Sequence, residues 1–278
     1  MPCAAYLSCP VCGGSLTGAE GSARCAEGHA FDYARSGYLN LARQSRGRGR
    51  VGDTAAMVRA RDELLGTGRY EGIARGVVAA ARAAGARAAV VAEIGSGTGY
   101  HLDAVVSALR ESGAGPECGF GFDLSKPATA LASRRHPSLR FAVADAEVAI
   151  PLIDSAAGLV LSVFAPRPAA ELGRVTRPGG ELVVAFAGPR HLERLRERLC
   201  LISVQEDKLE RLTARLAPWF DPVSAVPVEY EAEFAEQDAR RLVQMGPNAW
   251  HGFDPGAIAG PLRDLVSVVV ARFRRAKD

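Results

Sequence analysis

The stretch AVVAEIGSGTGYHLDAVVSALRESG, Ala89–Gly113, decides the fold class of this chain. Its first six residues are apolar except for Glu93 and are typical of a buried strand, and a helical pattern begins near Tyr100. The turn GSGTG joins the two and places glycines at 95, 97 and 99. Backbone N–H groups and the positive end of the helix can face a ligand at such a turn. The stretch therefore predicts the first strand, the ligand-binding turn and the first helix of an α/β sheet.

The same alternation continues downstream. Helical patterns separate the strands, one running through Arg135 and one over 168–180 that stops at Pro-Gly-Gly. Short apolar strands that alternate with helices predict a parallel sheet covered on both faces. The expected strands are 89–94, 117–125, 139–146, 157–165 and 181–188.

The flanking regions extend this sheet. Upstream, residues 53–84 predict two helices with a break at Gly66 to Gly68, and Asp53 or Thr54 is the expected N-cap. Downstream, two more strands are expected at 227–237 and 265–275 around a helix at 238–246. These strands would complete the sheet, with an antiparallel last strand as one alternative.

The sequence of the glycine turn argues against two common classes of nucleotide-binding site. A dinucleotide fingerprint needs a glycine or alanine where this turn continues with Tyr100 or Leu102, and no Gly-Lys-Ser/Thr follows for a P-loop. What remains is Glu93, Gly95, Gly97 and Gly99 in the pattern E-x-G-x-G-x-G. This pattern resembles the S-adenosylmethionine loop of class I (Rossmann-like) methyltransferases.

Two carboxylates at the ends of neighbouring strands suit the same cofactor. Asp123 ends the second strand and offers two acceptor oxygens to ribose hydroxyls, although a helix N-cap is its simpler interpretation. Asp145 follows the third strand and can meet the adenine amino group, although it can also be an ordinary turn residue. Their order after consecutive strands favours cofactor binding.

The N-terminal segment carries a metal-binding pattern. Cys9-x2-Cys12 and Cys25-x3-His29 are two short pairs of the ligands that zinc prefers. Clustered reduced thiols or a disulfide are the alternatives. A segment of about 35 residues buries too little surface to fold alone, and all four positions are filled by protein ligands. The pattern therefore predicts one structural zinc ion, whose binding would supply the folding energy.

Composition and charge indicate the general class of the protein. The chain has 278 residues, 48% of them hydrophobic and 23% charged, and a net charge of +3. No signal peptide precedes the cysteines and no apolar run reaches about 18 residues, so we expect a cytoplasmic protein with no membrane segment. A basic stretch, RQSRGRGR, is either a solvated linker or a contact for phosphates. Its arginines are Arg43, Arg46, Arg48 and Arg50.

These patterns divide the chain into three parts. We expect a zinc-binding domain at 1–40, a basic linker arm at 41–52 and a class I methyltransferase domain at 53–278. The oligomeric state stays open, with a homodimer as one alternative.

This order of parts resembles the ribosomal large-subunit RNA (guanine-N1)-methyltransferases, the RlmA/TlrB group, over nearly the whole chain. The match is closer to the macrolide-resistance branch of actinomycetes than to the enterobacterial one. The motifs that carry the resemblance are CPVC with C-x3-H, F-D-x-A-R-x-G-Y-L-N-L (31–41), D-T-A-x-M-V-x-A-R (53–61), E-I-G-S-G-T-G-Y-H, D-L-S-K-P-A (123–128), V-F-A-P-R (163–167), R-P-G-G (177–180), G-P-R-H-L (188–192) and M-G-P-N-A-W-H (245–251).

The resemblance implies residue roles. It places zinc ligands at Cys9, Cys12, Cys25 and His29. It places cofactor contacts at Tyr70, at Gly97-Thr98 and at His191. Glu93 and Thr98 stand where other members of the family vary, which leaves the exact cofactor contacts open.

The implied substrate is 23S ribosomal RNA, with the zinc domain as an RNA-recognition module. Guanine N1 lies on the Watson–Crick edge, so the base must come from a loop or be flipped out. Phe164 and Trp250 are candidate platforms for stacking it, although aromatic side chains in such places are more often core. No catalytic base can be named. A small-molecule methyltransferase of antibiotic biosynthesis and a binding module without catalysis are the rival functions.

Overall fold

The computed structural model describes residues 2–19, 21–42, 51–85, 88–198, 205, 207–246 and 260–277. The arginines of the basic arm and Trp250 lie outside these ranges. No helix in the described part of the chain is both long and apolar enough to cross a membrane.

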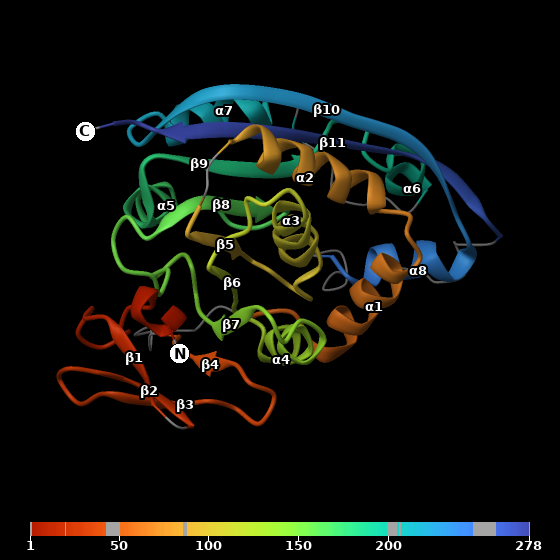
Figure 1. Ribbon diagram of the computed structural model, residues 1–278. Helices are drawn as coiled ribbons and strands as arrows, with labels where there is room; N and C mark the ends of the chain where they lie inside the picture. The colour runs from red at the N-terminus through yellow and green to blue at the C-terminus, as the bar shows by residue number, and fades with distance from the viewer. Residues whose placement is uncertain are drawn as a thin grey trace.

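An eight-stranded sheet forms the centre of the molecule, in the order β10-β11-β9-β8-β5-β6-β7-β4 (Figure 1). All neighbours pair in parallel except β11, which is antiparallel to both β9 and β10. The order confirms the predicted α/β fold and the antiparallel alternative for the last strand. The strands are β4 Leu39–Asn40, β5 Val90–Ile94, β6 Cys118–Asp123, β7 Arg140–Val143, β8 Ala157–Val163, β9 Thr176–Ala187, β10 Phe220–Phe234 and β11 Leu262–Arg275.

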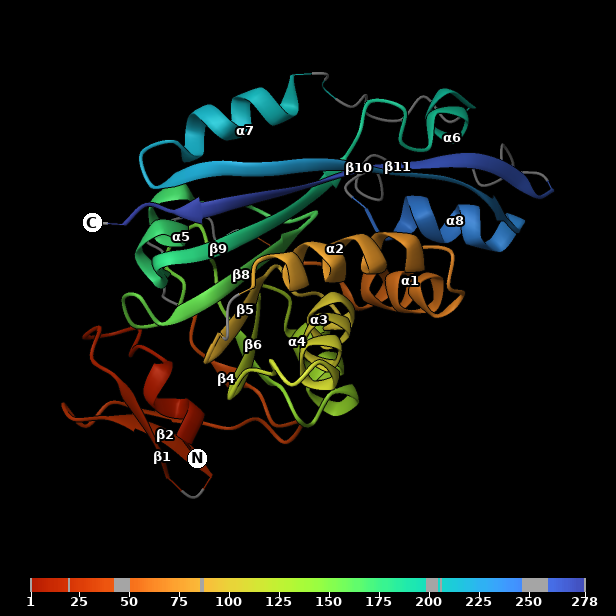
Figure 2. The ribbon, with the colours of Figure 1, turned by 45° about the horizontal axis from the view of Figure 1, so that its top comes forward.

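Helices cover both faces of this sheet, with α2 and α3 on one side and α7 on the other (Figure 2). Each face carries its own apolar cluster. One includes Ile73 of α2 and Val105 of α3, and the other includes Leu172 of α5 and Leu212 of α7. The helices are α1 Ala55–Gly66, α2 Glu71–Ala83, α3 Tyr100–Glu111, α4 Lys126–Arg135, α5 Ala169–Val175, α6 Glu193–Arg198, α7 Lys208–Leu216 and α8 Glu236–Gln244.

The largest departures from the expected element boundaries are at the end of α5 and the start of β10. Helix α5 ends at Val175, before Pro-Gly-Gly, because Thr176 already pairs with Ala157 of β8 and belongs to β9. Strand β10 begins at Phe220 rather than near 227, because it pairs with β11 over its whole length. Pro222 and Pro227 fit this strand because β10 is at the edge of the sheet, where a missing N–H costs little.

The N-terminal module is a small three-stranded sheet of β1 Leu16–Ala19, β2 Ser22–Cys25 and β3 Ala30–Asp32, preceded by the 3-10 helix η1 Pro2–Tyr6. The segment after β3 then enters the large sheet as β4, which pairs in parallel with β7. The F-D-x-A-R-x-G-Y-L-N-L motif over 31–41 thus contributes to both sheets, through β3 and β4.

This module fills a gap in the cover of the large sheet. Residues 144–156, all described, connect β7 to β8 through turns and an isolated bridge rather than a helix. The module packs there: Leu7 bridges Leu152, and Ser8 N–H donates to the Pro151 carbonyl at 3.2 Å. A disulfide between Cys3 and Cys118 adds a covalent link that the sequence did not predict.

Candidate functional site

A cavity of about 420 Å³ opens at the carboxyl ends of β5 and β8. The chain leaves β5 toward β6 and β7 and returns to β8 on the other side of β5. Ligands of open α/β sheets bind at such a reversal of strand order, because the loops after the two strands diverge there. The GSGTG turn follows β5, and Phe164-Ala165-Pro166 follows β8; both line the cavity.

The glycine turn holds a backbone conformation that other residues disfavour. Gly95, Gly97 and Gly99 all have positive φ, at 65°, 53° and 79°. A Cβ at Gly95 would lie 2.5 Å from that of Ala165, so the two loops need a glycine to approach each other. A Cβ at Gly97 would meet nothing closer than 3.7 Å and would project toward the cavity. Gly97 is therefore where the backbone can lie against a ligand.

Asp123 organises this turn. Its Oδ2 accepts the N–H of Gly97 and its Oδ1 accepts the N–H of Ser125, both at 2.8 Å. Burial raises the pKa of Asp123, and the nearby carboxylate of Asp53 adds to the effect. Each oxygen keeps a further lone pair for a donor in the cavity, such as a ribose hydroxyl.

The other two carboxylates differ in exposure. Glu93 is 1% exposed and accepts the Leu102 N–H at 3.0 Å, which fixes the first turn of α3; burial raises its pKa well above the usual value. Asp145 lines the cavity and accepts the Glu147 N–H at 3.1 Å, so it is also the turn residue of its alternative interpretation.

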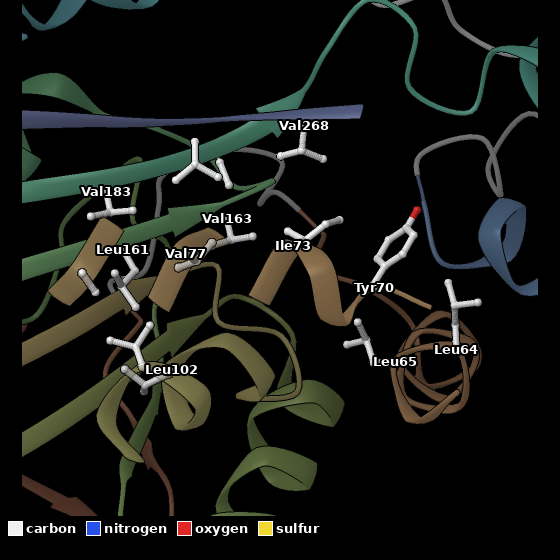
Figure 3. Close-up of a cluster of buried hydrophobic side chains, with 14 of the residues drawn as sticks. Leu64, Leu65, Tyr70, Ile73, Val77, Leu102, Leu161, Val163, Val183 and Val268 are labelled. Carbon is white, nitrogen blue, oxygen red and sulfur yellow. The ribbon is translucent and has the colours of Figure 1, made fainter. Parts of the chain in front are cut away.

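Tyr70 and His191 meet although 121 residues separate them. The Ser267 N–H donates to His191 Nδ1 at 3.2 Å, so the neutral ring carries its proton on Nε2 and donates toward the Tyr70 hydroxyl at 3.5 Å. The Tyr70 proton is then free to point elsewhere. Tyr70 closes the end of the buried apolar cluster next to Ile73 and Leu65 (Figure 3). Burial, with the charge of Arg196 second, lowers the pKa of His191 to about 4.

The cavity gathers most of the residues expected to contact the cofactor. Gly99 and His191 do not line it: Gly99 faces His136 and Phe141, and His191 stands behind Tyr70. The residues that do line it are Tyr70, Glu93, Gly95, Gly97, Thr98, Asp123 and Asp145.

Sequence reasoning missed the wall of the cavity formed by α1 and the residues before it. Thr54 is the N-cap of α1, and Asp53 instead forms an ion pair with Arg61 beside the glycine turn. Arg61 also donates to the Met245 carbonyl at 2.6 Å, which joins α1 to the end of α8. Asp53, Arg61 and Met245 all line the cavity. The signal was available, because Asp53 and Arg61 begin and end the D-T-A-x-M-V-x-A-R motif.

Phe164 lies at the mouth of the cavity. Its side chain is 44% exposed, its φ is 52°, and its ring centroid is 6.1 Å from that of His191. A bulky residue in this backbone region costs on the order of 1–3 kcal/mol, which the surrounding structure must offset. Phe164 therefore exposes an aromatic surface at the cavity instead of packing in the core.

The four expected zinc ligands converge in the N-terminal module. Their ligand atoms all lie within 4.8 Å of one another. The Cys12 and Cys25 sulfurs are 3.7 Å apart, and His29 Nδ1 is 3.3 Å from the Cys25 sulfur and 3.7 Å from that of Cys9. A tetrahedron with Zn–S distances of about 2.3 Å places two sulfurs about 3.8 Å apart, so the donor set fits one zinc ion.

Comparison with known proteins identifies the family of the chain. The zinc-ribbon family described as RlmA, N-terminal, matches residues 7–43. The 23S rRNA (guanine(748)-N(1))-methyltransferase of Streptomyces fradiae is 39% identical over 265 residues, which covers 95% of this chain and 92% of that protein. A protein of Micromonospora griseorubida, also named for 23S rRNA (guanine-N1)-methyltransferase activity, is 36% identical over 97% of both chains. A Bacillus subtilis protein with the same activity in its name is 30% identical over 87% of this chain. With a methyl-donor cleft and a zinc ribbon in one chain, and with relatives at this identity over nearly its full length, the protein belongs to the family of S-adenosylmethionine-dependent 23S rRNA (guanine-N1)-methyltransferases.

Proposed function

We propose that this enzyme methylates N1 of one guanine in a loop of domain II of 23S RNA, near the peptide exit tunnel. The observation that carries the proposal is the 39% identity to the Streptomyces fradiae enzyme over 95% of the chain. The cavity that ends at the exposed Phe164 supports it, because a planar base can enter there. A methyl group at N1 removes a hydrogen-bond donor and adds bulk to one base edge, so we further propose that the product obstructs macrolides in the tunnel.

The cofactor side of the cavity is assigned to the residues that line it. S-adenosylmethionine, when bound, supplies a methyl group on a positively charged sulfur. The Gly97-Thr98 backbone, Asp123 and Asp145 line the cavity. The backbone would lie against the cofactor, Asp123 would accept from its ribose and Asp145 from its adenine amino group. Tyr70 donates its hydroxyl proton into the cavity while His191 holds the Tyr70 oxygen. Glu93 supports the cofactor site indirectly, because it fixes the start of α3 through the Leu102 N–H.

The acceptor side is assigned to Phe164. Stacking on its ring would hold the flipped guanine with N1 toward the methyl donor, and base–aromatic stacking is worth about 1–3 kcal/mol. Positioning accounts for most of the expected rate gain, because in-line attack requires N1 and the methyl carbon to be about 3–3.5 Å apart.

The zinc module is proposed to recognise the RNA around the target loop. Cys9, Cys12, Cys25 and His29 would hold the ion and keep the module rigid. Its contacts with residues 151–153 place it on the same body as the cavity, so one RNA hairpin can touch both.

Primer extension on 23S RNA tests the product directly. RNA from cells that lack the host enzyme, incubated with this protein and S-adenosylmethionine, should stop reverse transcriptase one nucleotide before the target guanine, because a methyl at N1 blocks pairing. A reaction without the cofactor is the control. Labelled RNA with no stop would mean a different atom or base. A label that enters a metabolite but not RNA would favour the small-molecule methyltransferase instead.

A further inference from the structure

Two cations lie over one aromatic ring beside the cavity mouth. The Arg167 guanidinium carbon is 5.8 Å from the centre of the Phe186 ring, and the Lys208 Nζ is 5.9 Å from it. Phe186 is 2% exposed and lies near the carboxyl end of β9. Arg215 joins them from α7, where its Nη2 donates to the Arg167 carbonyl at 2.8 Å. We call Arg167, Lys208 and Arg215 the cation cluster.

The cluster has no matching anion within the described residues. Two carboxylates close to these cations in sequence pair with other arginines, Glu171 with Arg174 at 2.7 Å and Asp207 with Arg211 at 3.7 Å. The buried Arg167 Nε has no hydrogen-bond partner among the described residues. Burial and the neighbouring Arg215 charge lower the pKa of Arg167, and burial and Arg167 lower that of Lys208. Partly buried like charges held this close together favour the binding of an anion.

The cation cluster lies close to Phe164, the residue proposed to stack on the guanine. Arg167 is three residues beyond Phe164, in a turn braced by Ser162, whose Oγ donates to the Pro166 carbonyl at 3.3 Å. Lys208 begins α7, whose N-terminal N–H groups add partial positive charge. The charge of Lys208 also contributes to the low pKa of His191, whose ring centroid lies 6.1 Å from that of Phe164.

We propose that the cation cluster binds a backbone phosphate of the RNA next to the guanosine that stacks on Phe164. Arg167 offers the planar donor fork that suits a phosphate, and Lys208 adds a compact charge. A flipped base carries its own phosphates with it, so a phosphate held here fixes how far the base can enter. The substrate in this inference rests on the proposed function.

Methionine substitutions test the site, because methionine keeps the apolar contact with Phe186 and removes the charge. The variants are Arg167→Met, Lys208→Met and the double variant. Arg211→Met is the matched control, since Arg211 is on the same helix, is 61% exposed and pairs with Asp207. Affinity for an unmodified 23S RNA transcript is measured against salt concentration, beside S-adenosylmethionine affinity and thermal unfolding.

The double variant should bind this RNA roughly ten- to a hundredfold more weakly. Its salt slope should fall by about 0.7–0.9 for each phosphate that the variant no longer neutralises, while its cofactor affinity matches wild type. If Arg167→Met does not fold, Lys208→Met alone should show the smaller share of both effects. A folded double variant with wild-type RNA affinity, an equal loss in Arg211→Met, or a loss of cofactor affinity would overturn this inference alone. Absence of the reverse-transcriptase stop with the wild-type enzyme would instead overturn the proposed function, and with it the substrate assigned here.

Discussion

His191 shows how burial sets the chemistry of a single side chain. The residue is 9% exposed. Its Nδ1 accepts the Ser267 N–H, and its Nε2 lies 3.5 Å from the Tyr70 hydroxyl oxygen. A cationic imidazole would lose the Ser267 bond, because a protonated Nδ1 cannot accept. His191 therefore serves as a fixed neutral donor that orients Tyr70.

The low pKa of His191 predicts a loss of stability in acid. Its folded-state pKa is about 4, below the value of about 6.5 expected when unfolded, so between these values the unfolded chain binds more protons. The contribution is fully present above pH 6.5 and is lost as the pH falls toward 4, by up to about 3 kcal/mol. The free energy of unfolding, measured in urea between pH 4 and pH 6.5, should therefore fall less steeply with decreasing pH for His191→Gln than for the wild type. If the two stabilities changed equally with pH, folding would not lower the pKa of His191 and the prediction would be wrong.

Asp123 connects three elements at once. It ends β6, holds Gly97 of the turn after β5, and holds Ser125, whose Oγ is the N-cap of α4 and also donates to the Asp53 carbonyl at 2.6 Å. The Asp123 carboxylate therefore holds the glycine turn and the start of α4 directly, and the segment before α1 through Ser125.

Removing that carboxylate should weaken the cofactor site. We expect Asp123→Ala to lower S-adenosylmethionine affinity by roughly 1.5–3 kcal/mol, the range for hydrogen bonds to a charged group. Asp123→Asn keeps one acceptor oxygen and should lose less. Calorimetry measures both, with Asp221→Asn on the exposed edge strand β10 as the control for the charge. Unchanged affinity in Asp123→Ala would remove this residue from the cofactor site.

The zinc module and the methyltransferase sheet form one body. Leu7 and Leu16 of the module belong to the same buried cluster as Phe120 of the large sheet and Leu152 of the β7–β8 connection. The module covers the sheet face where the β7–β8 connection supplies no helix, so its folding and the cover of that face depend on each other.

Loss of the metal should therefore also lower the stability of the methyltransferase domain. Cys12→Ser is expected to release zinc and unfold the first 35 or so residues, because the ion supplies about 10–16 kcal/mol of apparent binding energy. The cofactor domain should remain folded but with a lower free energy of unfolding, since the module's apolar cover is lost. Metal analysis, circular dichroism and cofactor binding report these effects. Cys3→Ser, outside the ligand set, should keep its zinc; retention of one zinc per chain by Cys12→Ser would contradict the prediction.

Local patterns in the sequence determined the fold class, the glycine turn and the convergence of the two pairs of zinc ligands. These depend on residues a few positions apart, where spacing alone dictates geometry. Strand ends were less certain: β10 begins at Phe220 because its partner β11 reaches Arg275, which no local pattern records.

Tertiary structure alone decided which distant residues meet. The pairing of Tyr70 with His191, the entry of β4 into the large sheet, the wall formed by Asp53 and Arg61, and the cation cluster on Phe186 all join segments far apart in the chain. The resemblance pointed to Tyr70 and His191 but not to their contact. Such contacts follow from how the sheet is ordered and covered, because packing brings together side chains whose sequence separation carries no signal.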